Sequence, residues 1–168
     1  MKKLLIALLL TTVSTTLFAQ LKPYQPNPVL DKFVGTWIAQ RGKNMVTITI
    51  KKIQEPVMNS KMDFLAGYLL HKDNDQILEE SANPLLTVGI NYASNGEMFQ
   101  DKVFFNYFDQ KKGKSGKLIL ILSKANPNEF TTQLVEVGDV RVVTPSTPYK
   151  KIEMGFTFPN GLVFNKKQ

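Results

Sequence analysis

The fold is decided by two neighbouring stretches, FVGTWIAQ at residues 33–40 and NMVTITIK at residues 44–51. Apolar and polar side chains alternate in the second stretch, and a period of two is typical of a half-buried strand. The RGK segment between the stretches predicts a two-residue turn, which places Trp37 beside Val46 or Ile48 on the apolar face. The two stretches therefore predict an antiparallel hairpin.

Similar short runs continue along the chain, separated by turn signals such as Asp73-Asn74-Asp75, Asn95-Gly96 and Pro159-Asn160-Gly161. No helical pattern of three turns follows residue 33. The sequence predicts an all-β fold, an antiparallel up-and-down barrel of eight to ten short strands, because a barrel leaves fewer exposed edges than an open sandwich. The further runs are residues 62–71, 76–81, 86–92, 103–108, 117–123, 130–134, 152–158 and 162–164.

The first 19 residues have the layout of a cleaved signal peptide. Lys2 and Lys3 precede the apolar run LLIALLL at residues 4–10, and a Thr- and Ser-rich stretch then ends at Ala19. The alternative, a membrane anchor, is disfavoured because the apolar run is much shorter than the roughly 20 residues that span a bilayer. We expect export to the periplasm or to the extracellular space.

Residues 20–28 contain three prolines and predict an extended tether. At its end, Asn27 and Pro28 form a pattern of helix cap followed by proline in the first turn, which predicts a short helical turn over residues 29–32. Residues 29–168 are expected to form a single β-barrel domain.

The sequence FVGTW at residues 33–37 resembles the Gly-x-Trp signature of lipocalins and fatty-acid-binding proteins. The resemblance implies an up-and-down barrel in which Trp37 closes one end and the interior holds a small apolar ligand. Gly35 would let another part of the chain approach closely. The other motifs of these families are absent, and Arg141 is only a distant candidate for the arginine that covers the tryptophan. The resemblance therefore implies the architecture and the role of Trp37 alone.

The whole chain is similar to small secreted bacterial proteins of unknown function. The similarity lies in the Gly-Thr-Trp start, in Gly67-Tyr68 and in the turn Asn126-Pro127-Asn128. It implies export and a lipocalin-like fold.

The composition disfavours most kinds of chemistry. The chain has no cysteine and a single histidine, so disulfides, a lipid-anchoring cysteine and a zinc site are not expected. His71 lies next to the turn at residues 73–75 and is predicted to be solvated. There is no Gly-x-Ser-x-Gly elbow for a nucleophile. We expect a protein without cofactor or metal and without enzymatic activity.

Lysines gather around Gly113, at the predicted tip of a hairpin. The sequence Gly113-Lys114-Ser115 lacks the first glycine and the helix of a phosphate-binding loop. Two interpretations of this basic tip remain open: it contacts anionic surfaces of the cell envelope, or it is a solubilising loop that protects the apolar hairpin from edge pairing. A role in nucleic-acid binding is disfavoured, because export is expected and removal of Lys2 and Lys3 with the signal peptide lowers the net charge from +7 to a mild +5. The tip comprises Lys111, Lys112, Lys114 and Lys117.

Aromatic side chains are the best candidates for a binding site, because they would line or cap the barrel and a buried tyrosine hydroxyl needs a partner. We expect an exported, non-enzymatic, lipocalin-like protein that binds a small apolar molecule. The alternative is a barrel packed solid by its own side chains, which acts as an envelope interaction module through the basic tip. The candidate ligand-binding residues are Trp37, Ile48, Phe64, Tyr68, Tyr92, Phe105 and Tyr107.

Overall fold

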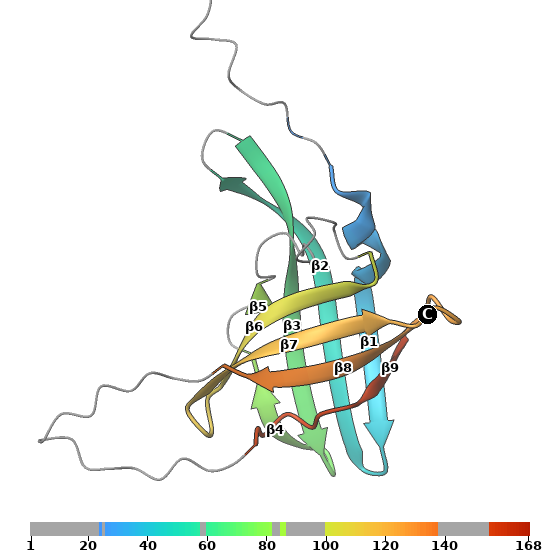
Figure 1. Ribbon diagram of the computed structural model, residues 1–168. Coiled ribbons are helices and arrows are strands. Elements are labelled where there is room, and N and C mark those ends of the chain that lie inside the picture. The colour runs from blue at the N-terminus through green and yellow to red at the C-terminus, as the bar shows by residue number, and fades with distance from the viewer. Residues whose placement is uncertain (1–23, 25, 58–59, 82–84, 87–99, 138–154) are drawn as a thin grey trace, which may run out of the picture.

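The computed structural model describes residue 24 and residues 26–57, 60–81, 85–86, 100–137 and 155–168 (Figure 1). These residues form strands and one short 3-10 helix, η2 (Pro28–Phe33), which confirms the predicted all-β class. The strands are β1 (Gly35–Arg41), β2 (Asn44–Val57), β3 (Ser60–Asp73), β4 (Gln76–Glu80), β5 (Leu85–Leu86), β6 (Lys102–Asp109), β7 (Lys114–Leu122), β8 (Glu129–Glu136) and β9 (Val163–Lys166).

The strands form one antiparallel sheet in the order β4-β3-β2-β1-β9-β8-β7-β6, and β5 pairs with β3. The sheet is curled, so that β6, β7 and β8 cross in front of β1, β2 and β3 (Figure 1). The last strand joins the two halves, because β9 pairs with β1 on one side and β8 on the other. Within the described residues no ladder joins β4 or β5 to β6. The molecule is therefore a half-barrel with a seam between these edges.

The first hairpin has the predicted register. Trp37 pairs with Ile48, and Arg41 pairs with Asn44, which leaves Gly42 and Lys43 as the two-residue turn. Gly42 has a φ of +62°, in the left-handed region that tight hairpin turns need. The indole of Trp37 consequently faces the inside of the curled sheet.

The inward face of β3 is the opposite of the predicted one. Ile48 pairs with Leu69, and Ile50 pairs with Gly67, so Leu65 and Leu69 face the core. Phe64 and Tyr68 lie on the other face, and Tyr68 is 40% exposed. Both faces of this strand carry apolar side chains, so its alternation does not reveal which face is buried; pairing with β2 decides it.

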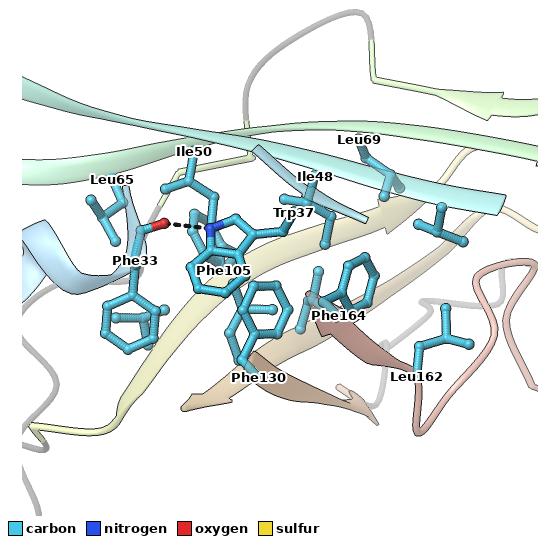
Figure 2. Close-up of a cluster of buried hydrophobic side chains, with 14 of the residues drawn as sticks. Phe33, Trp37, Ile48, Ile50, Leu65, Leu69, Phe105, Phe130, Leu162 and Phe164 are labelled. Atoms are coloured by element: carbon cyan, nitrogen blue, oxygen red, sulfur yellow. Dashed lines mark hydrogen bonds between the residues drawn. The ribbon is translucent and has the colours of Figure 1, made fainter. Parts of the chain in front are cut away.

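The core fills the Trp37 end of the half-barrel. Trp37 is fully buried, and its ring centroid lies 4.6 Å from that of Phe130, which stacks on Phe164 at 4.9 Å. Figure 2 shows these rings packed with Ile48 and Phe105. Side chains from both halves of the sheet thus occupy the interior here. The largest fully buried side chains also include Phe33, Phe158, Ile50, Leu65, Leu118 and Leu120.

The N-terminal segment is attached to β3 through Asp63. The hydroxyl of Tyr24 and the backbone N–H of Asn27 donate to this carboxylate at 2.5 Å and 2.8 Å, and the ammonium of Lys52 lies 3.3 Å from it. Asn27 also caps η2 by accepting from the N–H of Val29, as predicted. The described end of the predicted tether is therefore held against the sheet.

The late apolar run is not a strand over its described part. Residues 155–158 form bends and irregular backbone, although Phe158 is buried. The turn at Asn160-Gly161 and the strand after it are as predicted. The predicted strand positions Ile152 and Met154, like Val88, Ile90 and Tyr92, lie outside the described residues.

Candidate functional site

A cleft of about 570 Å³ lies along the seam of the half-barrel. Its walls come from β4 and β5 on one side and from β6 and β7 on the other. The seam is where the two ends of the curled sheet meet, so side chains of both edges converge there. The lining consists of Leu69, Glu79, Glu80, Ser81, Leu85, Asn106, Tyr107, Phe108, Gln110, Ser115, Gly116, Lys117 and Val137.

A tyrosine and a glutamate join the two edges across the seam. The hydroxyl of Tyr107 on β6 lies 2.7 Å from Glu79 Oε1 and 2.9 Å from Glu79 Oε2 on β4. Burial raises the pKa of Glu79; the hydrogen bond from Tyr107 opposes this shift, and the negative charge of Asp109 adds to it. Burial and the neighbouring carboxylate also raise the pKa of Tyr107, so the phenol keeps its proton and remains the donor.

A β-bulge gives Glu79 its inward direction. Asp73 pairs with Gln76 and Lys72 with Ile77, a register that would place Leu78 opposite His71. The register shifts between His71 and Lys72, and His71 instead pairs with Glu79. Directly paired residues share a face of the sheet, so Glu79 faces inward with the buried His71.

Asp109 positions the segment that packs against the ring of Tyr107. Its carboxylate is fully buried and accepts hydrogen bonds from the N–H of Lys112 and from the N–H and hydroxyl of Thr157. These bonds fix residues 155–158 beside the end of β6. The rings of Phe156 and Phe158 then pack against Tyr107, with centroids 5.7 Å and 5.9 Å away. The phenol at the cleft floor is therefore held in one position.

The cleft also has apolar walls and an exposed aromatic rim. Leu69 is buried at the inner side, and Leu85 packs against the core. Phe108 is 55% exposed, on the outward face of β6, and Val137 is also exposed. Both side chains belong to the lining, so they add apolar surface at the solvent-exposed part of the cleft.

The candidate ligand-binding residues from the sequence divide into three groups. Tyr107 lines the cleft, while Trp37, Ile48 and Phe105 lie in the packed core. Phe64 and Tyr68 were predicted to line the interior; this placement is wrong for both, and Tyr68 instead packs under the ammonium of Lys51 at 5.6 Å on the outer face. Tyr92 lies outside the described residues.

One of the four lysines of the predicted basic tip is buried. Lys114 is only 4% exposed; its ammonium pairs with Glu136 at 3.2 Å and lies over the ring of Phe156. It sits at an inward position of β7, so the prediction that it is part of an exposed tip is wrong. Lys111 and Lys117 are exposed, and Lys112 is half-buried in the turn.

His71 is buried rather than solvated. It is 2% exposed, and its Nε2 lies 2.9 Å from Asn44 Oδ1, while its Nδ1 has no hydrogen-bond partner among the described residues. The prediction of a solvated turn residue is wrong because His71 pairs with the inward-facing Val46 two positions before the turn. Burial lowers its pKa.

The sequence did not predict the inward positions of two residues, Glu79 and Lys166. Glu79 and Glu80 are neighbours in the sequence, so on a regular strand they would face opposite sides, and the bulge that turns Glu79 inward has no clear sequence signal. Lys166 covers the indole of Trp37, with its ammonium 5.2 Å from the ring centroid. Its spacing in the final strand, two residues after the buried Phe164, could have indicated this inward position.

Two kinds of feature are not found in the described part of the chain. It contains no group of three or more histidine, cysteine, aspartate or glutamate side chains arranged to hold a metal ion. Among the same residues, no helix has the length and apolar character needed to cross a membrane.

Fold and cleft together define an antiparallel β half-barrel with an open, partly polar seam. The chain belongs to a family of unknown function (DUF6705), whose model matches residues 1–167. Searches of the curated proteins and of the solved structures found no match. The half-barrel is consistent with the barrel architecture that the Gly-x-Trp resemblance implies; these findings do not extend to membership of the lipocalins.

Proposed function

We propose that the protein is an exported, non-enzymatic binding protein that holds a small, mainly apolar molecule in the seam cleft. The observation that carries the proposal is the cleft itself, whose volume of about 570 Å³ falls in the usual range for small-molecule sites. Apolar walls with a few convergent polar groups are the usual composition of such sites. Among the polar groups of this lining, Glu79 and Tyr107 are hydrogen-bonded to each other across the cleft.

The position of the cleft differs from the one that the lipocalin resemblance implies. The interior near Trp37 is filled by Phe130, Phe164 and their neighbours, so a ligand there would have to displace packed rings. The seam offers space without that displacement. Export rests on the layout of residues 1–19.

Binding of Nile red, a neutral apolar dye, tests this proposal. We expect one equivalent of dye to bind and to fluoresce in the purified protein. Ser115→Trp places a large ring in the cleft from the half-buried position 115 and should weaken binding at least tenfold. The matched control is Thr131→Trp, at an exposed position of β8 that does not line the cleft. Absence of dye binding, or equal binding by both variants, would contradict the proposal.

A second candidate function, an envelope interaction module, is favoured by the solid core at the Trp37 end and by the exposed Lys111 and half-buried Lys112 at the β6–β7 turn. It predicts binding to vesicles that contain phosphatidylglycerol and none to pure phosphatidylcholine. Lys111→Glu combined with Lys112→Glu should abolish this binding. Retention of binding by the double variant would exclude the basic tip as the contact.

A further inference from the structure

The carboxylate of Glu79 is the distinctive chemical group of the seam cleft. The bulge in β4 turns it inward, and Tyr107 on the opposite edge holds it. It therefore stands at a fixed place between apolar walls, where a ligand would meet it. The inference that follows rests on the proposed function and specifies the chemistry of the ligand.

The hydrogen-bonding capacity of Glu79 is only partly used. An ionised carboxylate offers about four lone-pair sites, whereas a phenol hydroxyl supplies one hydrogen. Tyr107 is the one donor to Glu79 among the described residues, and no lysine or arginine of this part of the chain forms an ion pair with it. A ligand that brings further donors would complete the hydrogen bonding of this carboxylate.

The local charge favours a positively charged donor over a neutral one. Asp109, fully buried at the end of β6, adds a second negative charge near Glu79, and its own oxygens are already bonded by Lys112 and Thr157. Hydrogen bonds from a cation to a carboxylate are about twice as strong as neutral ones. An ammonium group at the cleft floor would offset both the burial and the mutual repulsion of these carboxylates.

The apolar side chains of the lining favour an apolar body. Leu69 and Leu85 line one wall, and Phe108 and Val137 lie at the other. Lys117 and Glu80 both line the cleft and are exposed. Their opposite charges leave the entrance of the cleft without a strong net charge. An acidic ligand head would have to approach Glu79 directly and would be repelled.

We infer that the cleft binds an apolar amine, with a protonated amino group that donates to Glu79 at the floor and a hydrocarbon or aromatic body against Leu69, Leu85 and Phe108. The amine would supply hydrogens to the lone pairs that Tyr107 leaves unused. The structure thus assigns a ligand class to the proposed site.

Three probes that share one body and differ in the head group test this inference: 4-phenylbutylamine, 4-phenylbutan-1-ol and 4-phenylbutanoate. We expect calorimetry to show that the amine binds at least tenfold more tightly than the alcohol, and that the acid binds least. Glu79→Gln keeps an acceptor for Tyr107 and should remove the preference for the amine over the alcohol. Glu55→Gln makes the same charge change at an exposed position outside the cleft and should keep the preference.

A pH series on the unaltered protein provides the same test without a variant. The ratio of the amine affinity to the alcohol affinity should fall as acid protonates Glu79. The alcohol corrects for the other titratable groups around the cleft, which are His71, Glu80, Tyr107, Asp109 and Lys117.

The outcomes separate the two proposals. If the alcohol or the acid binds as tightly as the amine, or if Glu79→Gln keeps the preference, the amine inference is wrong and the binding function stands. If none of the three probes binds, the amine inference is wrong, and binding of Nile red decides whether the binding function stands.

Discussion

Lys166, two residues from the end of the chain, holds its ammonium 5.2 Å from the centroid of the Trp37 indole. Gly35 makes this approach possible, because a Cβ at that position would lie 2.7 Å from Cε of Lys166. Gly35 also has a φ of +136°, which other residues rarely adopt. The first and last strands of the chain, β1 and β9, are neighbours in the sheet, and this side-chain contact adds to their short backbone ladder.

This contact predicts a measurable contribution of Lys166 to stability. Lys166→Gln should lower the free energy of unfolding by about 1 kcal/mol, the usual size of a cation–π contact that is partly shielded from solvent. Lys167→Gln, at the exposed neighbouring position, makes the same charge change and should have little effect. Denaturant unfolding of the two variants measures the difference; equal stabilities would show that the contact contributes nothing.

Trp37 and Tyr68 should differ sharply in their effect on stability. Trp37→Ala opens a cavity among Phe130, Phe164 and their neighbours and should lower the free energy of unfolding by about 3–5 kcal/mol. Its Nε1 also loses the hydrogen bond to the carbonyl of Phe33, at 2.8 Å. Tyr68→Ala, on the outer face, should lower it by less than about 1 kcal/mol. A large effect of Tyr68→Ala would contradict the observed register of β3.

Asp63 should make stability depend on acidity. Burial alone would raise its pKa, but the hydrogen bonds from Tyr24, Asn27 and Lys52 hold the pKa below the ordinary value of 3.8. A carboxylate whose pKa is lower in the folded state stabilises that state above pH 3.8, and this stability is lost as the pH falls. Asp63→Asn should reduce stability at pH 7, by about 1–3 kcal/mol for the lost charged hydrogen bonds, and flatten the acid limb.

Unfolding of the Asp63→Asn variant between pH 2 and pH 7 measures this effect. Tyr24→Phe removes one donor and should shift the acid limb in the same direction by a smaller amount. An acid limb that is identical in the parent and in Asp63→Asn would show that another group causes it.

Much of the fold could be predicted from the sequence because its signals are local. The Gly42-Lys43 turn fixes the β1–β2 register, and Asn27 with Pro28 marks the start of η2. The faces of β3 could not be predicted, since Leu65 and Phe64 are equally apolar and only the pairing with β2 distinguishes them. Local patterns cannot decide a choice that depends on a neighbouring strand.

The candidate site was harder to predict than the fold, because its contacts join residues that are far apart in the sequence. Tyr107 was identified because an inward tyrosine needs a partner, but the partner, Glu79, reaches it only through the bulge in β4 and the curvature of the whole sheet. Lys114 was predicted to be exposed because lysines near a turn usually are. Its burial rests on Glu136 and Phe156, which come from distant parts of the sequence.

His71 should destabilise the protein in mild acid. Burial lowers its pKa below the ordinary 6.5, so the folded state favours the neutral ring. The stability of this neutral form is fully present above pH 6.5 and is lost as the pH falls towards the lower pKa of the folded state. His71→Leu removes this titration, and its free energy of unfolding should fall less than that of the parent between pH 7 and pH 5. If the free energy of unfolding falls equally in His71→Leu and in the parent between pH 7 and pH 5, the prediction is wrong.

Glu79 should act with the opposite sign over an overlapping range of pH. Its pKa is raised above 4.5, so its contribution is most favourable below pH 4.5 and is lost as the pH rises through the folded-state value. Glu79→Gln stays neutral and still accepts from Tyr107, so this variant should be more stable than the parent at pH 7, by about 1 kcal/mol or less for a carboxylate still partly in contact with solvent. The two proteins should converge below about pH 4, where both side chains are neutral. Glu80→Gln, at the exposed neighbouring position, should follow the parent at every pH.

Because His71 and Glu79 are paired on adjacent strands and titrate with opposite signs, the parent curve alone conceals both effects, and only denaturant unfolding of the separate variants resolves them. A Glu79→Gln variant that is less stable than the parent at pH 7 would mean that the ionised carboxylate stabilises the seam, and that the cleft floor does not lack a positive partner.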